Sequence, residues 1–298
     1  MAMGTENRKH KDSLFVDLFY EDESAKKNLL SLYNALHDTE YQDEGIIRKV
    51  RVGDVLYKNF KNDISFEADG RVLVLGEHQS TVNPNMPLRC LMYVGRAYEQ
   101  LVEKKARYRT TRVKIPTPEF YTFYNGTEDF PLEKELRLSD AFLDAPGGNS
   151  AELKVKVINI NSNKAHIILK KCGILREYSL FVDKVREHSI EEDSIKQAIN
   201  ECIRQGILSD YLKRKGSEVT NMLIAEYSYE EDIQVKQQEA MQKGQEEGRK
   251  EGRGEGLVLS AQIFRALQSN PDFTDAQIAV MVGCDLDDVE STRKAFGL

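Results

Sequence analysis

The clearest alternation of apolar and polar positions lies between residues 62 and 80. Two short runs with strand-type alternation flank the pair Asp69-Gly70, which is a strong short-range signal for a β-hairpin. A three-residue loop places Asp63 directly opposite Glu77, whereas a two-residue loop places Asp63 opposite Gly76. We favour the three-residue loop because it gathers the apolar residues on one face, as a half-buried hairpin requires. That face comprises Ile64, Phe66, Ala68, Val72, Val74 and Gly76.

The segments around this hairpin predict alternating helices and strands. Asp12-Ser13 can cap the first helix, and Met86-Pro87 opens the second. The predicted elements are, in chain order, a helix over 12–37 broken near 21–24, one or two short strands over 46–52 and 54–57, the hairpin, a helix over 86–105, and strands over 118–124 and 153–160.

From residue 165 the pattern is helical. Ser189 and Glu192 stand three residues apart and predict a capping box at the start of one helix. The segment 230–256 is almost entirely polar, and glycine recurs there at every fourth position. Glycine costs about 1 kcal/mol against alanine in a helix, so the segment is a weak helix or a linker. We favour the linker.

Residues 257–298 return to helical periodicity. Thr274 and Gln277 predict a capped helix that ends at Gly283, and Asp285 starts another. The outline is similar to a helix-turn-helix, but the acids of its second helix would be repelled by DNA phosphates. We therefore expect a module for protein interaction, through which the chain forms a homo-oligomer. Those acids are Asp285, Asp287, Asp288 and Glu290.

Four segments follow from these patterns. They are a mixed α/β core over 1–163, a helical extension over 164–229, the charged glycine-rich linker or weak helix over 230–256, and the small helical module over 257–298.

Composition places the chain among cytoplasmic proteins. Its four cysteines form no CxxC pair, which argues for a reducing compartment and against structural zinc or disulfides. The amino-terminal residues lack the apolar core of a signal peptide. No apolar run has the length that a bilayer requires, so we expect no membrane partner.

The hairpin carries the candidate chemistry. Opposed carboxylates at Asp63 and Glu77 repel each other unless a positive charge lies between them, and a divalent metal is the obvious candidate. Oxygen ligands favour Mg²⁺ or Mn²⁺, which supports phosphodiester hydrolysis. Gln79 shares a face with Glu77 and would hold the attacking water. The alternative is a surface hairpin with scattered charges.

Cations that could contact DNA follow this site. Arg89, Tyr93 and Arg96 share one face of the predicted helix. Between residues 96 and 114 seven lysines or arginines stand against two glutamates, although the chain carries a net charge of −7. A local basic patch of this kind is the usual footprint of phosphate binding. The residues that we expect to contact phosphate there are Lys104, Lys105, Arg107 and Arg109.

Asp63 followed by Glu77-x-Gln79 resembles the signature of PD-(D/E)XK nucleases, with glutamine where the pattern usually has lysine. The sequence is most similar to the Rpn family of recombination-promoting nucleases and putative transposases, over about residues 10–230. The segments that carry this resemblance are 61–66, 77–81, 85–89, 116–120 and 123–127.

The resemblance implies a restriction-endonuclease-like α/β fold, a mixed sheet flanked by helices, and metal-dependent DNA cleavage linked to recombination or transposition. It implies that Asp63 and Glu77 bind Mg²⁺ or Mn²⁺ and that Gln79 takes the lysine's role. Since glutamine is neutral, turnover would be slow. A further acid from the first helix, Asp12 or Asp17, could join the site. The alternatives are a catalytically weak DNA-binding or interaction protein on this scaffold, and a nuclease that acts on RNA.

Overall fold

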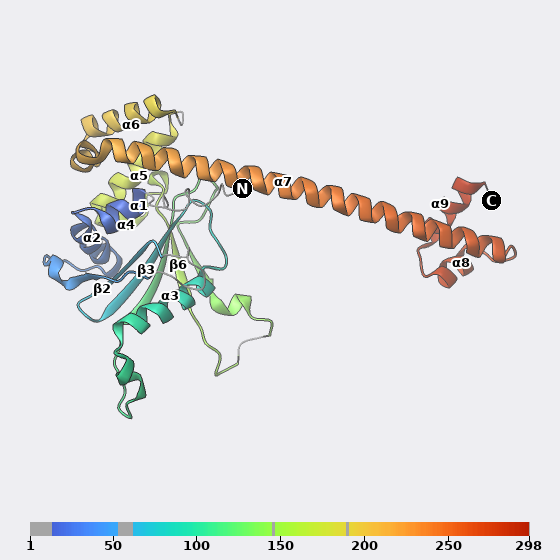
Figure 1. The fold of residues 1–298 in the computed structure, drawn as a ribbon, viewed down its shortest axis with the longest axis horizontal. Helices are drawn as coiled ribbons and strands as arrows, with labels where there is room; N and C mark the ends of the chain where they lie inside the picture. Colours follow the sequence, from blue (N-terminus) through green and yellow to red (C-terminus); the bar gives the residue numbers. More distant parts are fainter. Residues whose placement is uncertain (1–13, 53–61, 145–146, 189–190, 298) are drawn as a thin grey trace, which may run out of the picture. The chain divides into compact units, whose positions relative to one another are not determined.

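The structure is a computed structural model that describes residues 14–52, 62–144, 147–188 and 191–297 (Figure 1). It divides into two units, Met1–Tyr227 and Ser228–Leu298, and each is considered by itself. None of its described helices is both long and apolar enough to cross a membrane.

Among the described residues of the first unit, six strands form one mixed sheet in the order β1-β2-β3-β4-β6-β5. Strands β3, β4 and β6 run parallel, and the remaining pairs are antiparallel. The predicted mixed α/β class is therefore confirmed. The strands are β1 Ile47–Lys49, β2 Ile64–Ala68, β3 Val72–Gln79, β4 Thr117–Tyr124, β5 Glu133–Arg137 and β6 Lys154–Asn159.

The hairpin has the predicted register. Ala68 pairs with Val72 and Ile64 pairs with Gly76, which leaves a three-residue loop. Asp69 and Gly70 take φ angles of 51° and 65°, the left-handed region that glycine enters freely and aspartate tolerates better than most residues.

The expectation of a half-buried hairpin was wrong, because both faces of the sheet are covered. Helices α1, α2, α4 and α5 lie over one face, and α3 covers the other (Figure 1). Leu73 and Leu75 pack beneath Tyr93 and Val94 of α3. This helix connects parallel strands β3 and β4, and such a crossover lies across a sheet face.

The helices before β6 follow the prediction, including the break in the first one. A π-helical stretch, Asp17–Glu21, is followed by a turn at residues 22–24, where the break was predicted. The strand predicted at 54–57 lies outside the described residues, as does the cap at 12–13. Strand β5 was not predicted. The bounds are α1 Leu14–Val16, η1 Asp17–Glu21, α2 Ala25–His37, α3 Met86–Leu101 and the 3₁₀ turn η3 Lys104–Tyr108.

The helical extension shares the core of the sheet. Phe181 of α5 lies in the same buried cluster as Phe15 and Ile64, so this extension is part of the first unit. The predicted capping box is wrong: α6 begins at Glu192 with Glu191 as its N-cap. Glu192 is thus the first helical residue, where a capping box needs it to be the third; Ser189 lies outside the described residues. The helices are α4 Ile167–Lys171, α5 Gly173–Arg186 and α6 Glu192–Gln205.

Helix α7 spans Ser209–Ser269, with non-helical backbone angles at Lys215. It includes 230–256, so the favoured linker gives way to the helical alternative. The residues between the glycines are mostly glutamate, glutamine, lysine and arginine, which are good helix formers. They offset the cost of the glycines.

In the second unit, the end of α7 packs with two short helices, as predicted. Ile263, Ile278 and Val289 form its core. Thr274 and Gln277 form the expected capping box, and Gly283 ends the helix at a φ of 77°. The two helices are α8 Asp275–Val282 and α9 Leu286–Phe296.

A buried ion cluster joins η1 to the start of α7. Asp17 is 5% exposed and accepts hydrogen bonds from Tyr211 Oη at 2.6 Å and from Lys215 Nζ at 2.9 Å. Burial opposes ionisation of Asp22, but hydrogen bonds from Ser24 and Arg214 outweigh it and hold the pKa of this carboxyl well below its usual range. Asp17 therefore serves the packing of α7.

Replacement of Asp17 by alanine should destabilise the first unit, because Lys215 and Tyr211 would lose their buried acceptor. We expect the free energy of unfolding to fall by about 3 kcal/mol, as for other broken buried pairs. Urea denaturation measures this. Asp210→Ala is the control, since that carboxylate is fully exposed at 101%; equal unfolding midpoints for the two variants would contradict the packing role.

Candidate active site

The hairpin brings the predicted acids together at the edge of β2 and β3. Asp63 immediately precedes β2, and its Oδ2 accepts a hydrogen bond from the backbone amide of His78 at 2.8 Å. Glu77, on β3, is 3% exposed. Burial, and then the neighbouring charge of Asp63, raise the pKa of Glu77 to about 8. The charge of Asp63 therefore adds to burial in opposing the ionisation of Glu77.

Two side chains hold the Glu77 carboxylate. Asn62 Nδ2 donates to Oε1 at 2.9 Å, and Arg89 Nη2 forms an ion pair with Oε2 at 3.0 Å. Arg89 also donates to Tyr93 Oη at 2.8 Å. Burial opposes the charge on Arg89, but Glu77 outweighs it and raises the pKa of the guanidinium. The positive charge at the acid pair is therefore an arginine from α3.

The donor set is compatible with a divalent cation. Asp63 and Glu77 offer carboxylate oxygens whose repulsion a cation would relieve. Asn62 Oδ1 lies beside them, buried and without a hydrogen-bond partner. Within the described part of the chain, no three His, Cys, Asp or Glu side chains are grouped as metal ligands. Water and substrate oxygens would have to complete the coordination, and Arg89 would have to share Glu77 or release it.

Neither candidate acid of the first helix is seen to join this pair of carboxylates. Asp17 is engaged by Tyr211 and Lys215, as described above. Asp12 lies outside the described residues.

Gln79 follows Glu77 by two residues, but its amide bonds to the turn that enters α3. Its Nε2 donates to Met86 Sδ at 2.9 Å, and its Oε1 accepts from the backbone amide of Asn83 at 3.1 Å. The side chain therefore positions the amino-terminal end of α3, the helix that carries Arg89.

His78 lies between the two site residues and belongs to the core. Its Nε2 is 3.0 Å from Tyr178 Oη, and its ring stacks on Phe15 with centroids 4.9 Å apart. Burial, assisted by Arg186, lowers the pKa of His78 to about 4. The ring is neutral near pH 7 and anchors β3.

The predicted cationic face of α3 is divided. Arg89 reaches the acids, and Tyr93 is buried against it at 1% exposure. Arg96 instead pairs with Glu99 at 2.7 Å. Of the three, Arg89 is the cation placed to meet a phosphate at the acid pair.

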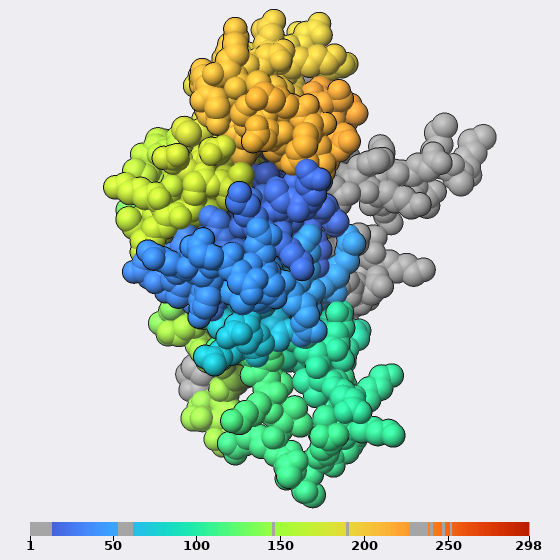
Figure 2. Space-filling view, turned by 90° about the vertical axis from the view of Figure 1, so that its left-hand side faces the viewer, coloured from blue at the N-terminus to red at the C-terminus, as the bar shows by residue number. Residues whose placement is uncertain are grey.

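The basic segment continues along η3 and is exposed. In Figure 2 this part of the chain, in green, forms the lower end of the visible surface. Arg107 donates to the carbonyl of Glu99 at 2.8 Å, and Arg109 lies 3.5 Å from Glu103. Tyr108 is 89% exposed among these cations. The four residues that we expect to contact phosphate, Lys104, Lys105, Arg107 and Arg109, are all exposed.

Asn125 and Gly126 contact the end of β3 and fix its position. The sequence pattern did not identify this role. The Asn125 amide donates to the carbonyl of Gln79 at 3.0 Å, and Arg186 holds the Asn125 side chain at 3.0 Å. A Cβ atom on Gly126 would lie 1.9 Å from the carbonyl oxygen of Ser80. Only glycine permits this approach.

Residues 35–161 match the family described as putative transposase, YhgA-like. This range includes the acid pair, Gln79, Arg89 and the Asn125-Gly126 turn. No curated protein and no solved structure matches the chain significantly.

Replacement of Gly126 by alanine should disturb the site through the backbone. The added Cβ must displace the carbonyl of Ser80 or the ring of Tyr124, so we expect a loss of about 1–3 kcal/mol, typical of overpacking. Thermal unfolding measures this. Gly148→Ala is the control, because its Cβ would meet nothing within 4 Å; a melting temperature shared by both variants would refute the close approach.

Proposed function

We propose that the chain, whose residues 35–161 match the family described as putative transposase, YhgA-like, is a metal-dependent endonuclease that hydrolyses phosphodiester bonds in DNA. The observation that carries the proposal is the opposed pair of Asp63 and Glu77, in which Glu77 is buried and Asp63 is half-buried. Such a pair costs stability and is compatible with cation binding. Its proposed setting is DNA recombination or transposition.

Asp63 and Glu77 would hold Mg²⁺ or Mn²⁺. When bound, such a cation polarises a phosphoryl oxygen and lowers the pKa of a water molecule. Arg89 would turn from Glu77 to the phosphate, which its planar guanidinium suits. Gln79 stands at the position of the signature lysine, and we assign it the support of the α3 turn and of the attacking water.

DNA would approach along the exposed basic segment. Lys104, Lys105, Arg107 and Arg109 offer sequence-independent phosphate contacts, with Tyr108 exposed among them. Since the chain is acidic overall, this local patch supplies the attraction. The four free cysteines suit the reducing cytoplasm in which we place the protein.

The second unit would join copies of the chain. Val280 is 85% exposed and Met281 is 52% exposed on α8, and Phe296 of α9 is 55% exposed. Apolar side chains gathered on so small a unit are typical of an interaction surface. A homo-oligomer formed there would bring two active sites to one DNA, an arrangement that metal-dependent nucleases often use to cut both strands.

A second candidate function is a DNA-binding or interaction protein with little catalytic activity. Two observations favour it: Arg89 already neutralises Glu77, and the amide of Gln79 is engaged by Asn83 and Met86. Such a protein would bind DNA with or without a divalent cation. The third alternative, cleavage of RNA, predicts the same dependence on the acid pair.

Removal of either acid should abolish DNA cleavage. Plasmid nicking by the full chain should require Mg²⁺ or Mn²⁺, stop in EDTA, and disappear in Asp63→Ala and in Glu77→Ala, because one carboxylate cannot replace the pair. Glu67→Ala is the matched control, since Glu67 is a buried acid of the same hairpin with its own arginine, Arg48. Undiminished nicking by both acid variants would refute the nuclease proposal.

Neutralisation of the basic segment should weaken DNA binding equally for all sequences. With glutamine at positions 104, 105, 107 and 109, the slope of log K against log salt should flatten by about 0.9 for each lost duplex contact. Fluorescence anisotropy across a salt series measures this. Replacement of Lys170 and Lys171 on α4 by glutamine is the control. An equal loss of affinity per removed charge there would show that the basic segment acts only through the net charge of the chain and makes no contacts of its own.

A further inference from the structure

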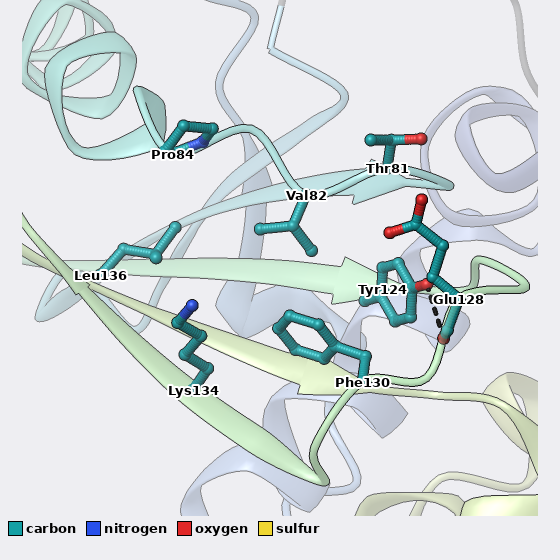
Figure 3. A pocket seen from close by; sticks show the side chains of 8 residues that line it. All are labelled: Thr81, Val82, Pro84, Tyr124, Glu128, Phe130, Lys134 and Leu136. Atoms are coloured by element: carbon teal, nitrogen blue, oxygen red, sulfur yellow. Dashed lines mark hydrogen bonds between the residues drawn. The ribbon is translucent and has the colours of Figure 1, made fainter.

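A pocket of about 230 Å³ opens beside the end of β3 (Figure 3). Three chain segments line it: the loop that follows β3, the end of β4 with the loop after it, and β5. The pocket is smaller than the sites that hold drug-sized ligands, so its size suits one planar ring system. Its lining residues are Thr81, Val82, Pro84, Tyr124, Glu128, Phe130, Lys134 and Leu136.

One wall of the pocket is aromatic and fixed. The rings of Tyr124 and Phe130 lie with centroids 4.7 Å apart. Tyr124 is 1% exposed, and its hydroxyl donates to the backbone carbonyl of Glu128 at 3.0 Å (dashed in Figure 3). Val82 and Leu136 add apolar surface. Tyr124 thus packs against Phe130, and the half-buried ring of Phe130 offers the surface that is suited to stacking against the face of a nucleobase.

A cation and an anion accompany this wall. On β5, Glu133 and Glu135 pair with lysines of β6, whereas Lys134 alternates to the other face and its ammonium reaches into the pocket (Figure 3). Glu128 lies on the side near Thr81. Among the described residues no ion pair of Lys134 or Glu128 is found. Both charges are thus available to a ligand.

These two groups match the edge of a base. An ammonium only donates hydrogen bonds, and a carboxylate only accepts them. The edges of nucleobases carry carbonyl or ring-nitrogen acceptors next to amino or ring N–H donors. A base is also planar, so its face can stack on the aromatic wall. Because it is neutral, its edge can bind the ammonium and the carboxylate without repulsion from either.

Met86 links the pocket lining to Gln79, which follows Glu77 by two residues on β3. Met86 packs in the same buried cluster as Tyr124 and Leu136. Its Sδ accepts a hydrogen bond from Nε2 of Gln79 at 2.9 Å. Thr81, which lines the pocket, lies in the loop two residues after Gln79, the last residue of the strand that carries Glu77. A nucleotide whose base entered here would lie close to a phosphate held at the acids.

We propose that this pocket binds an unpaired nucleobase of the DNA strand that is cut, a proposal that rests on the nuclease function above. A base inside a duplex is stacked and paired, and it reaches such a pocket only when it is single-stranded or turned out of the helix. The substrate is accordingly DNA with unpaired nucleotides next to the cleaved bond.

Binding in EDTA tests the pocket separately from catalysis. Fluorescence anisotropy compares the full chain on a labelled single-stranded DNA, on the same strand with one abasic position moved along it, and on the paired duplex. Lys134→Gln and Phe130→Leu should each weaken single-strand binding by about tenfold, the scale of one lost base contact, and leave duplex binding unchanged. Lys154→Gln, on the other side of the sheet and paired with Glu135, is the matched control.

An abasic site at the seated position should weaken binding by the wild-type chain and cause no further loss in Lys134→Gln. The inference is overturned if no abasic position matters, if the two variants bind single strands as the wild type does, if free nucleoside monophosphates bind but the oligonucleotide does not, or if an RNA strand of the same sequence binds better. These results would leave the nuclease intact whenever Asp63→Ala still abolishes plasmid nicking. Cleavage that survives in that variant would instead remove the proposed function.

Discussion

The register of β2 against β3 is the constraint on which the site depends. The left-handed residues Asp69 and Gly70 close a three-residue loop, and this loop sets Asp63 opposite Glu77. A slip of one residue would turn every side chain of a strand to the other face. The same register places Phe66 and Val74 in the main core. Apolar burial on both sides of the hairpin therefore holds two carboxylates together against their repulsion.

Helix α3 has two opposite effects on this repulsion. Its burial of Glu77 strengthens the repulsion, and its Arg89 side chain offsets it. It buries the face that carries Glu77, so the charges are poorly screened by water. From the same helix, Arg89 places a guanidinium on Glu77, while Asn62 donates from the other side. These two contacts offset part of the cost of burying the Glu77 carboxylate. A divalent cation would enter by competing with Arg89 for one carboxylate, which ties metal binding to the position of α3.

The sequence predicted the elements around the candidate site because their determinants are local. The hairpin, its loop, the start of α3 and strands β4 and β6 each show a strong pattern within a short window. Strand β5 was missed because Glu133–Arg137 contains a single apolar residue, Leu136, as befits an edge strand. The pairing of Asp17 with Lys215 joins residues far apart in the chain, and no local pattern can reveal it. Residues 230–256 are helical and not a linker, because the glutamate, glutamine, lysine and arginine residues between the glycines are good helix formers.

The departure from the nuclease signature at Gln79 has a physical basis in the turn before α3. That turn needs an acceptor for the Asn83 amide and a donor to the sulfur of Met86. An amide provides both, whereas a lysine has donors only and would leave the Asn83 amide without this partner. Glutamine thus secures the helix that carries Arg89. Arg89 lies on α3, 3.0 Å from Glu77, so in the nuclease that we propose the positive charge of the signature lysine would come from this helix instead of from the strand.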